Sequence, residues 1–106
     1  MLQKVLGQPI IGLHHDYERQ TLVVVLESML IRFKGCNSVY DFGVMGGALA
    51  LAEIYEGDFS QLIQLRQRGH DADDFEFCIL SRAKDVDAIP GKISIAFKEL
   101  EFEDNP

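Results

Sequence analysis

Thr21-Leu22-Val23-Val24-Val25-Leu26 has the composition of a β-strand that is buried on both faces. Five of these six residues are apolar, and the β-branched valines fit a pleated strand but lose rotamer freedom in a helix. A strand with one face in water would alternate apolar and polar residues, and no polar residue follows Thr21 before Glu27 and Ser28. We therefore expect this strand to lie at the centre of a sheet.

The flanking segments predict a three-stranded antiparallel meander over residues 10–34. Residues 10–16 form its first strand, and the polar residues 16–20 suit a turn into the central strand. Residues 29–34 form the third strand. Large apolar residues occupy positions 29, 31 and 33, and Leu30, Arg32 and Lys34 alternate with them. We expect the inward-facing residues of this third strand to be Met29, Ile31 and Phe33.

The first strand carries two histidines whose side chains should point to opposite faces, because successive residues of a strand alternate. One face should hold Ile11, Leu13, His15 and Tyr17, and the other should hold Ile10, Gly12, His14 and Asp16.

Beyond residue 35 the pattern is less regular. Gly35-Cys36-Asn37-Ser38 predicts a bend, after which residues 39–43 resume a strand. Residues 48–56 contain strong helix formers but also leucines at alternate positions, Leu49 and Leu51, so both helix and strand stay open there.

Residues 59–68 predict a short helix, because their apolar residues recur at helical spacing. Asp58 and Gln61 have the spacing of a capping box, and Gly69 suits the left-handed position after a helix. A helix this short is unstable alone and must pack on the sheet. A strand over residues 75–80 and a loop over residues 82–91, which contains Pro90, should follow.

Residues 92–102 predict a last strand in which the apolar residues change parity. Ile93, Ile95 and Phe97 occupy odd positions, whereas Leu100 and Phe102 occupy even ones. Strict alternation cannot change parity. We expect either a bulge near residues 98–99 or a strand that changes neighbours there.

Together these elements predict one α+β domain over residues 1–106. Its sheet should be curved and mainly antiparallel, with five or six strands, the N-terminal meander, and one or two short helices packed on it. The 106 residues, 47% hydrophobic and 25% charged, are typical of a globular domain. With two cysteines and no signal-like or membrane-spanning run, a cytoplasmic location is expected.

The charge is unevenly divided along the chain. Residues 1–35 carry four basic and three acidic groups, whereas residues 36–106 carry six basic and fourteen acidic groups, a net charge of −8. Such a surface repels nucleic acid and anionic membranes, so we expect neither as a partner. A basic protein partner is compatible with it.

No group of residues has a catalytic signature, and an enzyme is therefore disfavoured. His14 and His15 point to opposite faces, so they cannot bind one metal ion together. The cysteines have no neighbouring histidine, and the glycines of residues 43–47 lack the lysine of a phosphate-binding loop. We expect no metal and no other cofactor.

Two non-catalytic functions are open. One is protein binding through the acidic surface. The other is a small-ligand pocket, and for either purpose the candidate residues are Tyr40, Phe42, Tyr55 and Phe59, with His14 and Asp16 at the mouth. A homodimer is a further expectation, because exposed strand edges can recruit other strands.

Several segments resemble a group of small, largely uncharacterised bacterial β-rich domains. They are residues 11–26, Ile31-Arg-Phe-Lys-Gly-Cys, Tyr40-Asp-Phe and Ile93-Ser-Ile-Ala-Phe-Lys-Glu-Leu-Glu-Phe. Some of those domains are similar to immunity proteins of toxin systems, and others are orphan products of mobile gene cassettes. The resemblance covers about half of the chain, lies in the hydrophobic pattern, and implies no catalytic residue.

Overall fold

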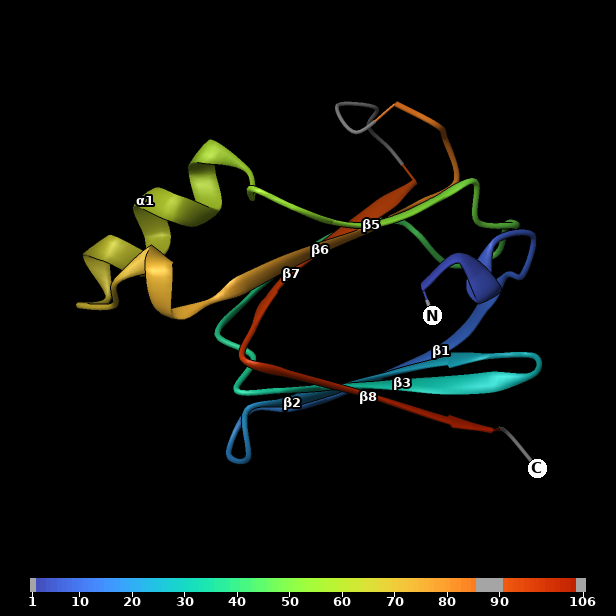
Figure 1. Ribbon diagram of the computed structural model, residues 1–106, viewed down its shortest axis with the longest axis horizontal. Helices are drawn as coiled ribbons and strands as arrows, with labels where there is room; N and C mark the ends of the chain where they lie inside the picture. Colours follow the sequence, from blue (N-terminus) through green and yellow to red (C-terminus); the bar gives the residue numbers. More distant parts are fainter. Residues whose placement is uncertain (1, 86–90, 105–106) are drawn as a thin grey trace.

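The computed structural model, which describes residues 2–85 and 91–104, contains two antiparallel sheets of four strands each (Figure 1). The strands of the first sheet, in spatial order, are β1 (Ile10–Asp16), β2 (Thr21–Leu26), β3 (Met29–Lys34) and β8 (Glu99–Asp104). Those of the second are β4 (Ser38–Phe42), β7 (Lys92–Phe97), β6 (Glu76–Ser81) and β5 (Leu51–Tyr55). The helical elements are α1 (Phe59–Gln67) and the 3-10 turns η1 (Leu2–Val5) and η2 (Ala72–Asp74).

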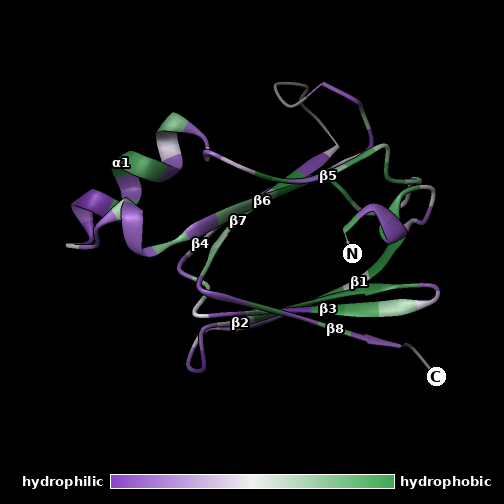
Figure 2. Ribbon diagram, viewed as in Figure 1, coloured by the Kyte–Doolittle hydropathy of each residue, from purple (hydrophilic) through white to green (hydrophobic). Residues whose placement is uncertain are grey.

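The two sheets pack face to face around one main hydrophobic core. Leu22, Val24 and Ile31 come from the first sheet, and Leu80 and Ile95 come from the second. The rings of Phe33 and Phe97 meet edge to face across the core, 5.1 Å between centroids. In Figure 2, hydrophobic stretches lie along β1 and β3, whereas the turn between β1 and β2 is hydrophilic.

The predicted N-terminal meander is confirmed. β2 pairs with β1 on one side and with β3 on the other, and Leu22 lies opposite both His15 and Phe33. β3 alternates as expected, with its odd-numbered residues buried and its even-numbered residues partly exposed. The prediction that β2 is buried on both faces is wrong, because only Leu22, Val24 and Leu26 are fully buried. The other residues of β2 are partly exposed and lie on the outer face of the sandwich.

The predicted faces of β1 are right for Leu13 and His15 but wrong at the start of the strand. The pairing register shifts between Ile10 and Gly12, so Ile11 is the extra residue of a β-bulge. Ile10 consequently points into the core, and Ile11 is 53% exposed.

Two long segments of the chain run from one sheet into the other, and both bend sharply where they cross. β3 continues into β4 through residues 35–37, and β7 continues into β8 through Lys98, so the β3–β8 pairing of one sheet becomes the β4–β7 pairing of the other. The parity change in residues 92–102 therefore marks a strand that changes neighbours, the second of the two predicted explanations. The sheet was predicted as one curved sheet of five or six strands. The structure has eight strands in two sheets, because each of these long segments supplies two strands.

Burial on both faces occurs in β7 and nearly so in β6. All six residues of β7 are buried, as are five of the six residues of β6. Their inner face joins the main core, and the outer face contacts α1 through a second cluster of Leu65, Phe75, Phe77 and Ala96. The helix predicted over residues 59–68 is confirmed as α1, with Asp58 and Gln61 in a capping box and Gly69 at a φ of +82°.

The open choice for residues 48–56 is settled in favour of a strand, β5, which pairs with β6. Part of the predicted loop over residues 82–91, including Pro90, lies outside the described residues. Within the described ranges, no helix has the length and apolar character that crossing a membrane requires. The class is α+β, with strands as the main component.

Candidate functional site

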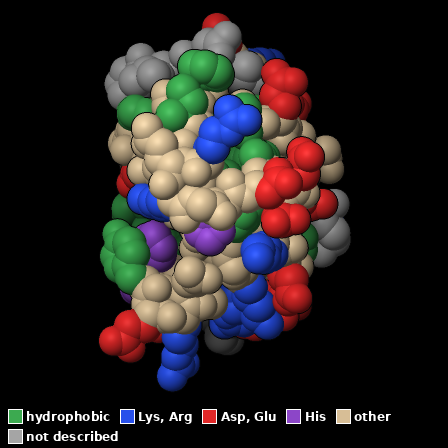
Figure 3. All heavy atoms as spheres, turned by 90° about the vertical axis from the view of Figure 1, so that its left-hand side faces the viewer, with side chains coloured by type: hydrophobic (Ala, Val, Ile, Leu, Met, Phe, Trp, Pro, Cys, Tyr) green, Lys and Arg blue, Asp and Glu red, His purple; other side chains and the backbone are tan. Residues whose placement is uncertain are grey.

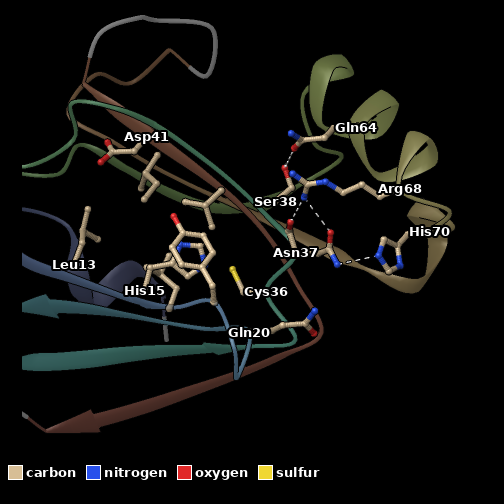
Figure 4. Close-up of a pocket in the computed structure, with 14 residues that line it drawn as sticks. Leu13, His15, Gln20, Cys36, Asn37, Ser38, Asp41, Gln64, Arg68 and His70 are labelled. Carbon is tan, nitrogen blue, oxygen red and sulfur yellow. Dashed lines mark hydrogen bonds between the residues drawn. The ribbon is translucent and has the colours of Figure 1, made fainter.

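A cleft of about 720 Å³ opens between the two sheets, beside the C-terminal end of α1 (Figure 4). We call it the inter-sheet cleft. One wall comes from the end of β1 and the start of β2, and the opposite wall comes from β4, Ile93 of β7 and the C-terminal half of α1. The lining residues are Leu13, His15, Tyr17, Gln20, Leu22, Cys36, Asn37, Ser38, Val39, Asp41, Gln64, Arg68, His70 and Ile93.

Hydrogen bonds fix the polar side chains where α1 meets β4 (Figure 4). Arg68 donates from Nη1 to the backbone oxygen of Asn37 at 2.5 Å and to its Oδ1 at 3.3 Å. The Asn37 Nδ2 lies 3.0 Å from Nε2 of His70. Next to them, the Ser38 hydroxyl donates to Oε1 of Gln64 at 2.8 Å. The cleft therefore carries a guanidinium group that is held in one orientation before any ligand arrives.

His15 reaches into the cleft from the opposite wall (Figure 4). Its ring lies against that of Tyr17, with centroids 4.0 Å apart. Partial burial lowers the pKa of His15 below its ordinary value, because desolvation of the imidazolium outweighs the attraction of the neighbouring Asp16 carboxylate. The neutral imidazole is thus favoured, and it can donate or accept a hydrogen bond in the cleft.

The deeper lining of the cleft is apolar and chemically inert. Leu13, Leu22, Val39 and Ile93 line it together with Cys36, whose sulfur is visible in Figure 4. Burial raises the pKa of the Cys36 thiol to about 12, so the reactive thiolate is scarce at neutral pH. The lining suits the hydrocarbon part of a ligand and does not supply a nucleophile.

A second concave surface, the outer groove, lies between α1, η2 and the end of the β5–β6 pair, with a volume of about 880 Å³. Its apolar lining includes Phe59, Ile63 and Phe77. Four exposed carboxylates line it as well: Glu56, Asp71, Asp73 and Glu76. The space-filling view of this end of the molecule shows acidic side chains gathered along one side and histidine side chains near the middle (Figure 3).

The structure distributes the six predicted site residues over three places. Tyr55 and Phe59 line the outer groove. Tyr40 and Phe42 contact each other on β4, 6.3 Å between ring centroids, and the Tyr40 hydroxyl donates to the backbone oxygen of Ser60 at 3.3 Å. These four aromatic rings therefore do not enclose one pocket. The other two residues, His14 and Asp16, are exposed on β1 and line neither concave surface.

Tyr55 is also a structural residue. Its hydroxyl contacts Ser94 and lies 3.3 Å from Oε1 of the buried Gln61. Burial raises the pKa of Tyr55 to about 12, so the phenol stays protonated. Tyr55 ties β5 to α1 and β7, and only part of its surface is available in the groove.

Sequence reasoning missed the polar residues of the inter-sheet cleft. His15 was detectable, since alternation places it with the core-facing Leu13. Asn37, Arg68 and His70 gave no signal, because they come together only when α1 packs beside β4. Among the described ranges, no group of three or more histidine, cysteine or acidic side chains has the arrangement of a metal site.

Comparison of the chain with models of protein families, with curated proteins and with solved structures found no match.

Proposed function

We propose that this chain is a non-catalytic, cytoplasmic protein-binding module that holds a basic, apolar segment of a partner in the outer groove. The observation that supports this most is the exposed apolar surface within an acidic rim. Phe59 is 77% exposed, and Ile54 and Ile63 are 47% and 40% exposed. Clustered apolar side chains in contact with water are typical of surfaces that bind another protein.

The rim supplies the preference for a basic partner. None of Glu56, Asp71, Asp73 and Glu76 forms an ion pair with a cation of the described residues. The groove also contains one cation, Arg66, so the carboxylates are in excess there. Lysine or arginine residues flanking an apolar segment would neutralise this excess and accelerate association.

Two of the four acidic residues of β8 already pair with cations of β3. Glu103 contacts Arg32 of β3, and Glu101 accepts a hydrogen bond of 2.6 Å from Lys34. These contacts lower the pKa of Glu101, with the hydrogen bond from Lys34 as the largest cause. Glu101 and Glu103 are thus neutralised by cations of β3, whereas the carboxylates on the rim of the outer groove are not paired with cations of the described residues.

In this proposal the chain acts by binding and covering a segment of its partner, in the manner of an immunity protein or of an accessory protein from a mobile gene cassette. No step of chemistry is assigned to it. The partner is defined by its chemistry, a positively charged segment with apolar side chains.

Selection from a random peptide library displayed on phage tests the proposal. We expect the enriched peptides to combine lysine or arginine with large apolar residues, and their binding to weaken as salt is raised. Phe59→Ser should weaken the selected peptides about tenfold or more, because an exposed aromatic anchor carries much of the energy of a contact. Asp73→Lys should weaken them too and reduce the salt dependence.

Tyr17→Ser is the matched control, because Tyr17 is 79% exposed but does not line the outer groove. It should leave peptide affinity unchanged. Enriched peptides without basic residues would contradict the charge argument, and equal losses for Phe59→Ser and Tyr17→Ser would contradict the location.

Self-association through a strand edge stays a separate prediction. The edge strands are β1 and β8 in one sheet and β4 and β5 in the other. A homodimer should sediment as such at micromolar concentration and should survive Phe59→Ser. A monomer in that experiment would refute it.

A further inference from the structure

We propose that the inter-sheet cleft is a second binding site, specific for a small organic anion that has a carboxylate at one end and an apolar body. Arg68 would bind the carboxylate, and the apolar lining between the sheets would contact the body. This site is distinct from the outer groove, and the proposal does not depend on the proposed function.

The first argument is the way Asn37 holds Arg68. The two hydrogen bonds from the guanidinium to Asn37 both leave from Nη1, and they are 2.5 Å and 3.3 Å long. The edge formed by Nε and Nη2 is not used in these bonds, and it is an edge whose two parallel N–H groups match a carboxylate. Because Asn37 already fixes the side chain, a ligand need not restrict its rotamers again.

The second argument is charge. Arg68 forms no ion pair with a carboxylate of the described residues, although the chain as a whole has a net charge of −7. The one carboxylate that lines the cleft belongs to Asp41, and its Oδ1 already accepts hydrogen bonds from the backbone N–H groups of Gly43 and Val44 at 2.9 Å and 3.2 Å. An anion should therefore be attracted to the Arg68 end of the cleft, where no carboxylate of the described residues pairs with the guanidinium.

The third argument is the size and character of the interior. A volume of about 720 Å³ lies within the range of pockets that enclose small molecules. Leu13, Val39 and Ile93 supply apolar contacts, and His15 and Gln64 offer hydrogen bonds to polar substituents. A simple inorganic anion would leave the apolar lining without contacts, so an anion with a ring or an alkyl body fits better.

A series of three related probes tests the proposal: naphthoate, its neutral amide, and naphthylmethylamine, which is a cation. Isothermal titration calorimetry should give tighter binding for naphthoate than for the amide, by at least tenfold, and the amine should leave the NMR resonances of the inter-sheet cleft unshifted. In amide NMR spectra, naphthoate should shift resonances of Leu13, Cys36 and Val39, and it should leave those of Ile54 and Ile63 in place.

Arg68→Gln should weaken naphthoate at least tenfold and leave the amide unaffected. Arg66→Gln is the matched control: it removes the same charge two residues earlier, in the last turn of α1, but Arg66 lines the outer groove and not the cleft. It should change naphthoate affinity less than twofold. If Arg68→Gln perturbs folding, Val39→Phe provides a second test. It adds bulk at an apolar lining position and leaves Arg68 in the sequence, so it should weaken both naphthoate and the amide.

Several results would overturn the proposal. They are equal affinity for naphthoate and the amide, equal losses in the two arginine variants, resonance shifts confined to the outer groove, and no binding of any probe at millimolar concentration. The basic peptides selected for the outer groove should still bind to the Arg68→Gln protein, so the two sites can fail independently.

Discussion

Gly35 and Lys98 face each other at the bend between the two sheets. Gly35 lies between β3 and β4, and Lys98 lies between β7 and β8. A Cβ atom on Gly35 would lie 2.9 Å from the Cβ atom of Lys98, and Gly35 has a φ of +65°. Next to it, the Lys98 N–H donates to the backbone oxygen of Lys34 at 2.8 Å. The close approach of the two strands therefore requires a residue without a side chain at position 35.

Gly35→Ala should lower the free energy of unfolding by more than the about 1–2 kcal/mol that a left-handed conformation costs an L-residue. Gly43→Ala is the control. Gly43 has a φ of +77°, but apart from its own chain neighbours no residue that the structure describes comes within 4 Å of the added Cβ. The difference between the two variants in urea denaturation isolates the contact with Lys98. Equal losses would mean that the bend can widen without cost.

Gln61→Leu should destabilise the protein strongly, even though leucine is apolar and of similar size. Gln61 is fully buried, its Nε2 donates to the backbone oxygen of Ser94 at 3.1 Å, and its Oε1 accepts from the Ser94 hydroxyl at 2.7 Å. Each buried polar group left without a partner costs about 1–3 kcal/mol. The exposed Gln67 on the same helix provides the control, and Gln67→Leu should shift the thermal midpoint little.

His15 should make stability fall as the pH drops below its ordinary pKa of 6.5. The pKa of His15 is lowered in the folded protein, so the unfolded chain takes up the proton at a higher pH and gains free energy relative to the folded state. The loss begins near 6.5 and continues until the folded protein is protonated too.

His15→Gln should accordingly flatten the stability profile measured by urea denaturation between about pH 8 and about pH 5. His14→Gln changes the exposed neighbour and should leave the slope as it is. A wild-type profile that is flat over this interval, or a slope that survives His15→Gln, would contradict the desolvation argument.

Both thiols should resist alkylation in the folded protein. Burial raises the pKa of Cys36 and of Cys78 to about 12, and their residues are 4% and 0% exposed. Iodoacetamide labelling followed by mass spectrometry should find both cysteines unmodified under native conditions and modified after denaturation. Rapid native labelling of Cys36 would show that the inter-sheet cleft opens to reagents more widely than its geometry indicates.

The sequence predicted elements better than it predicted their assembly. The meander, the bend at residues 35–38 and α1 follow from local signals: alternation, glycine and small polar residues, and a capping pair. The prediction that β2 is buried on both faces was wrong, because a strand rich in apolar residues can still have one half-exposed face. β7 has both faces covered although Lys92 and Ser94 interrupt its apolar pattern, since the main core covers one face and α1 covers the other.

The candidate site was harder to predict for the same reason. The aromatic residues of positions 40–59 were grouped by residue type, and they fall on β4, on β5 and on α1. The cleft depends instead on Asn37 and Arg68, which are 31 residues apart in the chain. Neither residue type is distinctive by itself, so only the packing of α1 beside β4 reveals them as partners.

The pairing of β3 with β8 has a consequence for synthesis on the ribosome. Arg32 and Glu103 are 71 positions apart, so β1, β2 and β3 can assemble long before the strand that completes their sheet has been translated. Throughout that interval β3 has one unpaired edge. β4 likewise has no pairing strand until β7 has been translated. A nascent chain arrested before β7 would expose two open templates for cross-chain pairing, which makes stalled or proteolysed fragments the expected source of aggregates and of chaperone clients.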